Sequence, residues 1–309
     1  MIPRLALSDL STIDEPLALA LGVFDGVHLG HQKVLAAART RAKESGGLAG
    51  VLTFEPHPIQ VLAPERAPRR LLAGSMHKRS ILEELGMDLL VVVDFDRSFA
   101  ARTAEEFLQI LQTAPHLTAL AVGEDWQFGK NRGGDAHLLK AFGQEFSVAI
   151  DSVSAIMDGG ERISSTRIRQ ALRDGNLAAA EQMLGRPYSI IGRVMEGKQL
   201  GRTIGFPTAN LLPEGEQLPP EGVWAVEARL PQGDWLAGVG NLGRRPTVKE
   251  EGLLKLEVHL FDWEEDFYGQ NLEVRFRHFL RGERKFADLD ALKKQIVLDA
   301  DEARQFFVL

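Results

Sequence analysis

The stretch GVFDGVHLGHQK, residues 22–33, is a glycine-rich turn between two apolar segments, PLALAL (16–21) and the helix-like VLAAARTRAK (34–43). A strand that ends in such a turn and enters a helix is a typical phosphate site, because the first helical turn presents unpaired N–H groups. His28 and His31 lie at positions i and i+3, so both imidazoles can face the same phosphate. The two histidines could equally do no more than cap the helix.

The first half of the chain repeats this alternation of strand and helix. Short runs rich in Val, Leu and Ile, typical of buried parallel strands, occur at residues 17–23, 48–54, 88–95, 117–123 and 146–153. Helical patterns separate them at residues 30–45, 75–86, 103–113 and 135–142. Strand and helix in alternation predict a doubly wound, Rossmann-like α/β sheet. Two short helices follow, and Pro187 after Gly185 predicts a domain boundary.

The second half has a different pattern. Strand-like runs at residues 188–195, 222–230, 235–242, 253–261 and 271–280 follow one another without helices between them. This order predicts an antiparallel sheet or small barrel. Near the C-terminus, residues 288–307 have apolar positions at helical spacing. We therefore expect an α/β domain over residues 1–185 and a small antiparallel β-barrel with a C-terminal helix over residues 186–309.

Composition narrows the classes of function. The chain has 309 residues, a net charge of −7 and no cysteine. Disulfides, thiolate metal sites and cysteine nucleophiles are excluded, and a reducing compartment is favoured. An acidic chain is not expected to bind nucleic acid. No apolar run approaches the ~20 residues of a membrane span, and the N-terminus does not read as a secretory signal, so we expect a cytoplasmic protein without membrane partners.

A second candidate phosphate motif is ISSTRIR, residues 163–169. It places the hydroxyls of Ser164, Ser165 and Thr166 at the expected start of a helix, followed by two arginines. Hydroxyl side chains are good helix caps. Together with free N–H groups and the guanidinium of Arg169, they can also form a clamp for a triphosphate.

Four segments together carry a family resemblance: GVFDGVHLGHQ, TFEPHP (53–58), VGEDWQFGKNRGGD (122–135) and ISSTRIR. They resemble the signatures of the adenylyltransferase module of the bacterial bifunctional riboflavin kinase/FMN adenylyltransferases. The resemblance implies that the FMN phosphate attacks the α-phosphate of ATP, giving FAD and pyrophosphate. No covalent intermediate is implied, so catalysis would consist of positioning and charge stabilisation.

The same resemblance implies roles for individual residues. His28 and His31 would contact the ATP phosphates as catalytic residues. The other ATP-binding residues would be Gly22, Phe24, Asp25, Gly26, Asp125, Ser164, Ser165, Thr166 and Arg169. The chain departs from the family pattern at Gln127, where members usually have a basic residue. The proline-rich loop of residues 55–70 either covers the flavin or is a rigid surface loop.

The strongest motif of the second half is GRTIGFPTANL, residues 201–211. In an extended segment Thr208 and Asn210, two apart, share one face. Hydroxyl and amide oxygens suit Mg²⁺, although turns also use both residue types freely. With GVGNLGRRPTV (238–248) and LEVHLFDWEEDFYGQNLEVRF (256–276), the segment resembles the riboflavin kinase module of the same family.

The resemblance implies transfer of the γ-phosphate of ATP to the ribityl 5′-hydroxyl of riboflavin. Thr208 and Asn210 would be Mg²⁺ ligands, Gly201 and Gly205 would contact ATP, and Glu257 would be the catalytic base. The alternation of Glu257 with Leu256 and Val258 places it instead on a solvated strand face. The expected partners are small molecules, namely ATP, riboflavin and FMN, and the expected state is a monomer or weak homo-oligomer.

Three alternatives remain beside a bifunctional enzyme. One module could be inactive, or the protein could be a flavin-binding regulator without catalysis. A regulator would be expected to lose residues such as His28, His31 or Glu257, and all are present. A third alternative, a different adenylyltransferase joined to an unrelated barrel, does not account for the PTAN segment.

Overall fold

The structure is a computed structural model that describes residues 1–196, 205–213, 215–231, 233–244, 254–263 and 268–308. The chain divides into two compact units. The first unit comprises Met1–Arg69 and Ser75–Ser165, and the second comprises Arg70–Gly74 and Thr166–Leu309. The five-residue segment from the first half therefore belongs to the second unit. The expected domain boundary at residue 185 stays a prediction.

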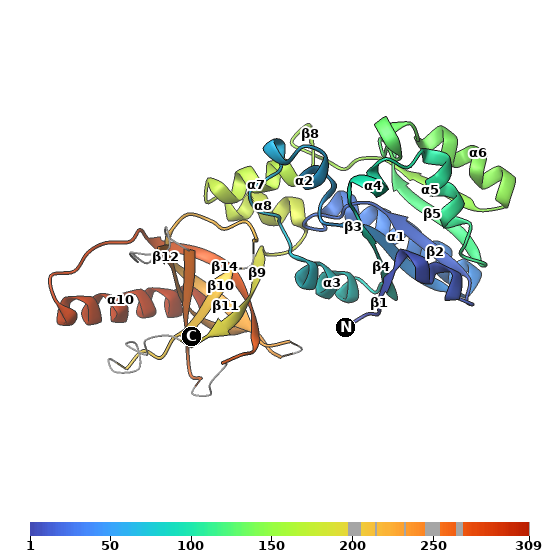
Figure 1. Ribbon diagram of the computed structural model, residues 1–309. Coiled ribbons are helices and arrows are strands. Elements are labelled where there is room, and N and C mark those ends of the chain that lie inside the picture. The colour runs from blue at the N-terminus through green and yellow to red at the C-terminus, as the bar shows by residue number, and fades with distance from the viewer. Residues whose placement is uncertain (197–204, 214, 232, 245–253, 264–267, 309) are drawn as a thin grey trace. The chain divides into compact units, whose positions relative to one another are not determined.

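The first unit is built on a six-stranded sheet whose strand pairs are all parallel (Figure 1). In spatial order the strands are β1 (Arg4–Ala6), β4 (Leu89–Asp94), β3 (Leu48–Glu55), β2 (Leu17–Leu21), β5 (Leu117–Gly123) and β6 (Ala149–Val153). The order reverses between β2 and β5, as in the doubly wound folds that bind ligands at this point. The doubly wound α/β prediction is confirmed.

Helices connect these strands. They are α1 (Leu29–Ser45), α2 (Pro58–Leu62), α3 (Ser75–Glu84), α4 (Arg97–Ala100), α5 (Ala104–Leu111) and α6 (Ala136–Phe146), with short 3-10 helices η1 (Leu7–Thr12), η2 (Pro64–Arg66) and η3 (Lys130–Arg132). A small hairpin, β7 (Met157–Asp158) and β8 (Glu161–Arg162), follows the sheet. All five residues of β2 are buried, because helices flank a parallel sheet on both faces. The core strands therefore read as continuous apolar runs.

The second unit contains a closed antiparallel barrel. Around the barrel the strands are β10 (Ala209–Pro213), β13 (Leu254–Leu260), β12 (Leu236–Arg244), β11 (Gly222–Arg229), β14 (Asn271–Arg281) and β9 (Ser189–Met195), and β9 pairs with β10 to close it. The barrel prediction is confirmed. The sequence pattern does not predict β10 as a strand. Its first three residues are all buried, so it lacks the alternation of a half-buried strand, and Pro207 lies just before it.

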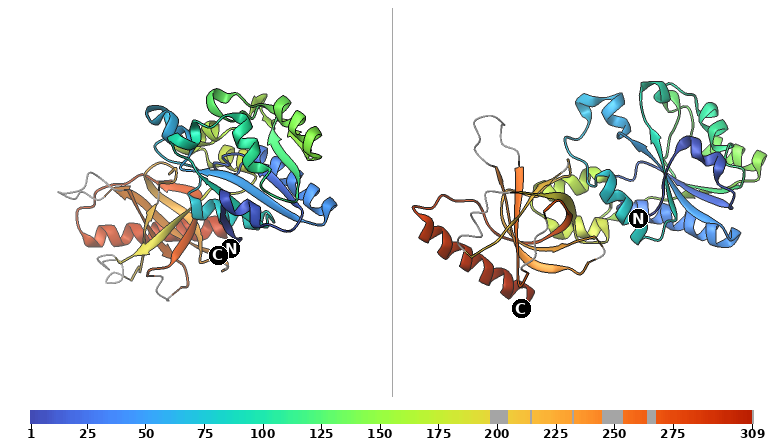
Figure 2. Two further views of the ribbon diagram at one scale, coloured as in Figure 1. Left: turned by 45° about the vertical axis from the view of Figure 1, so that its right-hand side comes forward. Right: turned by 60° about the horizontal axis from the view of Figure 1, so that its bottom comes forward.

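Among its described residues, the second unit also contains three helices. They are α7 (Ser165–Arg173), whose first residue lies in the first unit, α8 (Leu177–Leu184) and the C-terminal α10 (Leu289–Phe307). The two views of Figure 2 show α10 along the outside of the barrel. Its Ala300 and Ala303 pack with Ala225 and Phe261 of the barrel unit. Small residues on this helix allow close approach to the strands.

Candidate functional site

The glycine-rich loop, residues 22–28, joins β2 to α1 at the carboxyl edge of the sheet, where the strand order reverses. Gly26 has a φ of 78°, and the non-glycine residues Phe24 and Val27 have φ of 52° and 44°. Both side chains are fully buried, so core packing holds a left-handed backbone that is otherwise unfavourable. Residues held in this way cluster at functional sites.

His28 and His31 form one stacked pair at the start of α1. His28 is the N-cap residue, and its Nδ1 accepts a hydrogen bond from the His31 N–H at 3.3 Å. The two rings are nearly parallel, at 15°, with centroids 3.6 Å apart. Gly30 lies against this pair, since an added Cβ would stand 3.2 Å from the His28 ring. The structure therefore brings the two predicted imidazoles together at the helix N-terminus.

The ring of His31 is held neutral by its surroundings. Burial lowers the pKa of His31 well below its usual value, and the charges of His28, Lys78 and Arg162 lower it further. Within the part of the chain that the structure describes, the buried Nδ1 of His31 has no hydrogen-bond partner. A phosphate anion beside the ring would act in the opposite direction and raise this pKa. The site thus contains a neutral imidazole that gains proton affinity as negative charge approaches.

The hydroxyl motif reaches the glycine-rich loop through one contact. Ser165 begins α7, and its Oγ donates a hydrogen bond to the Asp25 carbonyl at 2.9 Å. Ser164 precedes it and is half-buried, while Thr166 is exposed. Ser165 therefore joins the hydroxyl motif to the glycine-rich loop within the first unit.

Arg169 lies further along α7, in the second unit. It is buried, and its Nε donates to the carbonyl of Arg70 at 3.2 Å. This part of the guanidinium therefore holds a backbone segment of its own unit. An interaction of Arg169 with ATP phosphates stays a prediction.

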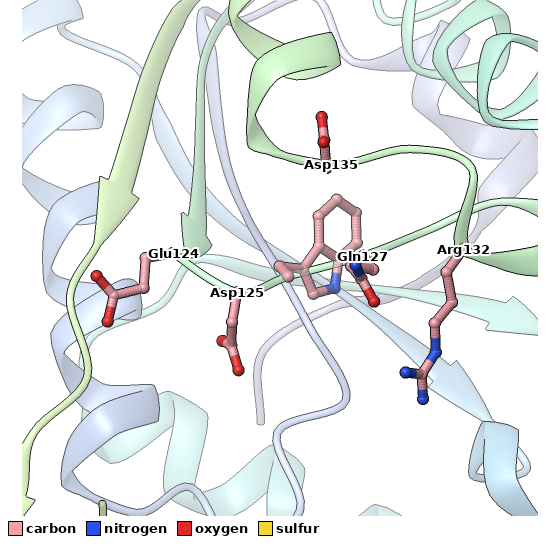
Figure 3. A pocket seen from close by; sticks show the side chains of 6 residues that line it. Glu124, Asp125, Gln127, Arg132 and Asp135 are labelled. Carbon is pink, nitrogen blue, oxygen red and sulfur yellow. The ribbon is translucent and has the colours of Figure 1, made fainter.

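The segment that connects β5 to α6 lines a pocket of about 570 Å³. It is lined by Glu124, Asp125, Trp126, Gln127, Arg132 and Asp135, and Figure 3 shows these side chains around it. The segment follows β5, so it lies at the same carboxyl edge of the sheet as the glycine-rich loop. Trp126 stacks on Phe128 with centroids 4.7 Å apart, which gives the pocket a rigid aromatic support.

Asp125 forms an ion pair with Arg162 of β8. Arg162 donates two hydrogen bonds to the two carboxylate oxygens, one of them Nη2 to Oδ1 at 2.9 Å. The hydrogen bond from the Arg162 side chain is the main reason why the pKa of Asp125 lies below its ordinary value. Both side chains are half-exposed, so a ligand can reach either partner.

The proline-rich loop of residues 55–70 contains two short helices, α2 and η2. His57 of the EPHP segment caps α2, and its Nδ1 accepts the Ile59 N–H at 3.2 Å. Pro58 follows at the first helical position, where its fixed φ and missing N–H are tolerated. The loop is thus locally ordered, and its role toward the flavin stays a prediction.

In the second unit, the PTAN segment leads into β10. Gly205 has a φ of 87°, and no atom of the described residues lies within 4 Å of where its Cβ would be. Thr208 immediately precedes the strand, and Asn210 is its second residue. Asn210 is buried, and its Nδ2 contacts the Thr208 carbonyl at 3.5 Å. Gly201 lies outside the described residues.

Glu257 lies between two asparagines across the barrel strands. It pairs with Asn210 of β10 on one side and with Asn241 of β12 on the other. Residues directly opposite in antiparallel strands point to the same face, so these three side chains form a polar row. Leu256, Val258 and Leu260 alternate with this row and are buried. The row is therefore on the outer face of the barrel wall.

Neighbouring contacts fix the surroundings of Glu257. Lys255 Nζ lies 3.2 Å from Glu257 Oε1, and the Glu257 side chain is 35 % exposed. On the next position of the same face, His259 Nδ1 lies 2.9 Å from the Pro207 carbonyl. This last contact ties the PTAN segment to β13. Glu257 is thus a half-buried carboxylate. Its exposure lies between that of the fully solvated residue expected from strand alternation and that of an enclosed catalytic base.

The donor set beside Glu257 fits a magnesium ion in its chemistry. Thr208 and Asn210 offer neutral hard oxygens, which Mg²⁺ accepts together with waters and substrate phosphates. The described residues include no group of three or more His, Cys, Asp or Glu side chains that could hold a metal ion. A metal at this site would consequently depend on substrate oxygens for most of its ligands.

Three polar residues of these sites were not identified from the sequence. Arg162 precedes the ISSTRIR motif, Lys78 comes from α3, and Asn241 lies inside the quoted GVGNLGRRPTV segment. In the described structure the buried Oδ1 of Asn241 makes no hydrogen bond. The sequence contained a signal for two of them, because Arg162 lies directly before a quoted motif and Asn241 lies inside one. Lys78 had none, because its burial depends on packing of α3.

Comparisons with known proteins match the two halves of the chain to two enzyme families. A family model described as FAD synthetase matches residues 10–167, and one described as riboflavin kinase matches residues 184–307. The bifunctional riboflavin kinase/FMN adenylyltransferase of Haemophilus influenzae is 44% identical over 94% of each chain. Its namesake in Escherichia coli K12 is 45% identical over 96% of this chain and 94% of the relative.

A solved structure has the same fold over the whole chain. It is described as a macrolide-efflux protein from Streptococcus pneumoniae, is 30% identical, and aligns with a TM-score of 0.83 over 98% of this chain and 99% of the other. Within the described residues of the present chain, no helix has the length and apolar character that crossing a membrane requires.

Proposed function

This chain belongs to the family of bifunctional riboflavin kinases/FMN adenylyltransferases and has both activities, and we propose which of its side chains perform each reaction. The N-terminal domain transfers the adenylyl group of ATP to FMN, and the C-terminal domain phosphorylates riboflavin. ATP is a substrate of both reactions.

For adenylyl transfer, we propose that His28 and His31 bind the ATP phosphates at the N-terminus of α1. The observation that supports this is the stacked pair of imidazoles where the strand order of the sheet reverses. The helix N-terminus offers N–H groups and partial positive charge to the same anion. Because burial and neighbouring positive charge lower the pKa of His31, its ring would gain a proton only as negative charge develops beside it.

Further residues complete the proposed ATP site. The proposed set comprises Gly22, Phe24, Asp25, Gly26, Asp125, Ser164, Ser165, Thr166 and Arg169. The left-handed turn at Phe24 and Gly26 shapes the loop beside the proposed nucleotide site, and Ser165 links the hydroxyl motif to the Asp25 carbonyl. The pocket beside Asp125 would hold part of one substrate. The reaction then needs only in-line approach of the FMN phosphate to the α-phosphate.

For riboflavin phosphorylation, we propose that Glu257 accepts the proton of the ribityl 5′-hydroxyl as the γ-phosphate is transferred. Its place beside Asn210 in the polar row supports this role. Thr208 and Asn210 would hold Mg²⁺, with Gly205 and Gly201 close to ATP. When bound, the ion would neutralise charge on the ATP phosphates. Lys255 would orient the Glu257 carboxylate through their ion pair.

We propose the cellular compartment of the enzyme from its amino-acid composition. A chain without cysteine suits the cytoplasm, where thiols are kept reduced. Small-molecule substrates require no macromolecular partner, and we propose a monomer or weak homo-oligomer.

The histidine assignment is tested by the double variant His28→Ala/His31→Ala. Loss of preorganised phosphate donors is expected to reduce FAD formation from added FMN by at least ~10²-fold. FMN formation from riboflavin should persist, because that chemistry belongs to the other module. The assay incubates the protein with ATP, Mg²⁺ and either flavin and separates FMN from FAD by chromatography. FAD synthesis near the wild-type rate would refute the phosphate role.

A further inference from the structure

Lys78 is a buried ammonium group that neither proposed reaction uses. It lies on α3 of the first unit and is 5% exposed. Lysine is almost never buried to this extent unless its charge is paired. Its position therefore requires a physical reason.

The contacts of Lys78 lead to the start of the glycine-rich loop. Its Nζ donates a hydrogen bond to the Val23 carbonyl at 3.0 Å, and the buried Thr53 Oγ1 donates to the same oxygen, also at 3.0 Å. Among the described residues, this is the one hydrogen bond of Nζ, and no carboxylate forms an ion pair with it. An ammonium has three donors, so the buried charge is incompletely solvated by the protein.

The charges of two carboxylates act on Lys78, and one of them, Asp25, belongs to the proposed ATP site. Burial lowers the pKa of Lys78, whereas the carboxylates of Asp25 and Glu55 act against this shift. The Glu55 oxygens are engaged by Ser75 and Arg4. The charge of Lys78 in turn acts on His31, together with the charges of His28 and Arg162. Lys78 is therefore close enough to the histidine pair to influence its protonation.

We propose that Lys78 is a positioning residue for adenylyl transfer, whose buried ammonium fixes the Val23 carbonyl and holds a positive charge near the histidine pair. The proposal rests on the proposed function of that pair. A fixed positive charge in a site of low polarity stabilises phosphate charge without reorganisation during the reaction. The phosphates of ATP and FMN would add anionic charge to that of the Asp25 and Glu55 carboxylates, which already act on Lys78.

This role predicts a conflict between activity and stability. If Lys78 is buried for the reaction rather than for the fold, replacing it with the apolar Met of similar length should not destabilise the first unit. If its purpose is structural, losing the bond to the loop should lower stability. The two roles therefore predict opposite shifts in the melting temperature.

The experiment compares Lys78→Met with wild type and with the matched control Thr53→Val. The control removes the other hydrogen bond to the Val23 carbonyl but leaves the charge in place. For Lys78→Met we expect kcat for FAD formation from FMN to fall about 10²-fold, with the KM for ATP changed less than about threefold. Thr53→Val should change kcat less than about fivefold.

Two further readouts separate positioning from folding. NMR titration of the histidine rings should give a higher pKa for His31 in Lys78→Met than in wild type, and the melting temperature of the first unit should be unchanged or higher. Riboflavin phosphorylation serves as an internal control and should not change.

Each other outcome overturns the proposal. A Lys78→Met variant that retains kcat within threefold, leaves the His31 pKa unchanged, unfolds, or matches Thr53→Val in its loss of activity would make Lys78 structural or irrelevant. If the wild-type protein makes no FAD, the proposed function itself fails, which distinguishes the two failures.

Discussion

His28 and His31 show how one short motif serves two purposes at the scale of single residues. The His28 Nδ1 accepts the His31 N–H and so caps α1, which is the structural role that histidines at a helix start can have. The buried Nδ1 of His31 has no such partner among the described residues. His28 therefore caps the helix, and the His31 ring that stacks on it keeps a nitrogen for the proposed contact with phosphate.

The lowered pKa of His31 predicts a pH dependence of stability. In the unfolded chain His31 takes up a proton near pH 6.5, whereas in the folded chain it does so only at lower pH. As pH falls below about 6.5, the unfolded state binds more protons and the free energy of unfolding decreases, by at most about 1.4 kcal/mol per pH unit. Above that pH the group contributes no slope.

This dependence can be measured by urea unfolding of the first unit at several pH values between 5 and 7.5. We expect His31→Gln to reduce the loss of stability on acidification, and the exposed control His116→Gln to leave it unchanged. Equal slopes in His31→Gln and wild type would show that His31 is not buried in its neutral form.

Glu257→Gln tests the base of the kinase reaction at the residue where strand alternation and motif disagree. The amide keeps the size of the side chain and loses its proton affinity. Riboflavin phosphorylation should decrease by about 10²-fold, the lower part of the usual range for a general base, since phosphoryl transfer also relies on positioning. FAD formation from added FMN should not change.

The matched control for this substitution is Glu221→Gln, a half-exposed carboxylate paired with Arg244. It should leave both activities at the wild-type level. If Glu257→Gln folds and phosphorylates riboflavin at a normal rate, Glu257 is only a polar residue of the outer barrel face.

At the scale of elements, α10 is attached to the barrel by both apolar and ionic contacts. Ala300 and Ala303 lie in the apolar cluster, and the buried Asp299 faces Arg281 of β14. Arg281 donates two hydrogen bonds to Asp299, at 2.8 and 2.6 Å, and Gln295 donates a third at 2.7 Å. Such a satisfied carboxylate fixes which face of the helix meets the strands.

Asp299→Ala should therefore destabilise the second unit by about 3–5 kcal/mol, because it leaves Arg281 without its partner. Asp290→Ala, in the first turn of the same helix, is the control and should cost less than about 1 kcal/mol. Urea unfolding followed by a barrel signal, such as the fluorescence of the buried Trp224, measures both. Equal effects of the two changes would contradict the anchoring role of Asp299.

At the scale of the whole molecule, the second unit is not one continuous piece of chain. The segment Arg70–Gly74 belongs to it, and Leu71 exchanges backbone hydrogen bonds with residues 215 and 217. The buried Glu216 accepts the Gly74 N–H at 2.8 Å and the Ile191 N–H at 2.9 Å. A kinase fragment cut at the domain boundary would lose the first of these partners.

A fragment of residues 186–309 should still fold and make FMN without FAD, since the closed barrel and α10 have their own core. We expect it to be less stable than the same unit in the full chain, by about 1–3 kcal/mol, from the lost bonds of Glu216 and Leu71. A fragment of residues 166–309 adds α7 and α8 but still lacks the segment, and should show the same deficit. Full stability in either fragment would show that residues 70–74 contribute nothing.

The sequence by itself determined the fold class of each half of the chain and contains the local motifs in which the proposed site residues lie. Hydrophobic runs of strand length alternating with helical patterns specify a parallel sheet, because burial on both faces requires apolar residues throughout. The motifs around His28, Ser165 and Asn210 are local, and their glycines, hydroxyls and prolines have the same conformational preferences in any context. These features could therefore be predicted from short segments.

Only the tertiary structure decided which distant groups meet. The burial of Lys78 below the Val23 carbonyl, the pairing of Asp125 with Arg162, and the row that joins Asn210, Glu257 and Asn241 depend on packing and strand register. The transfer of residues 70–74 to the second unit has no local signal at all. Such contacts join residues far apart in the chain, and their energies depend on desolvation, which no local pattern of residues contains.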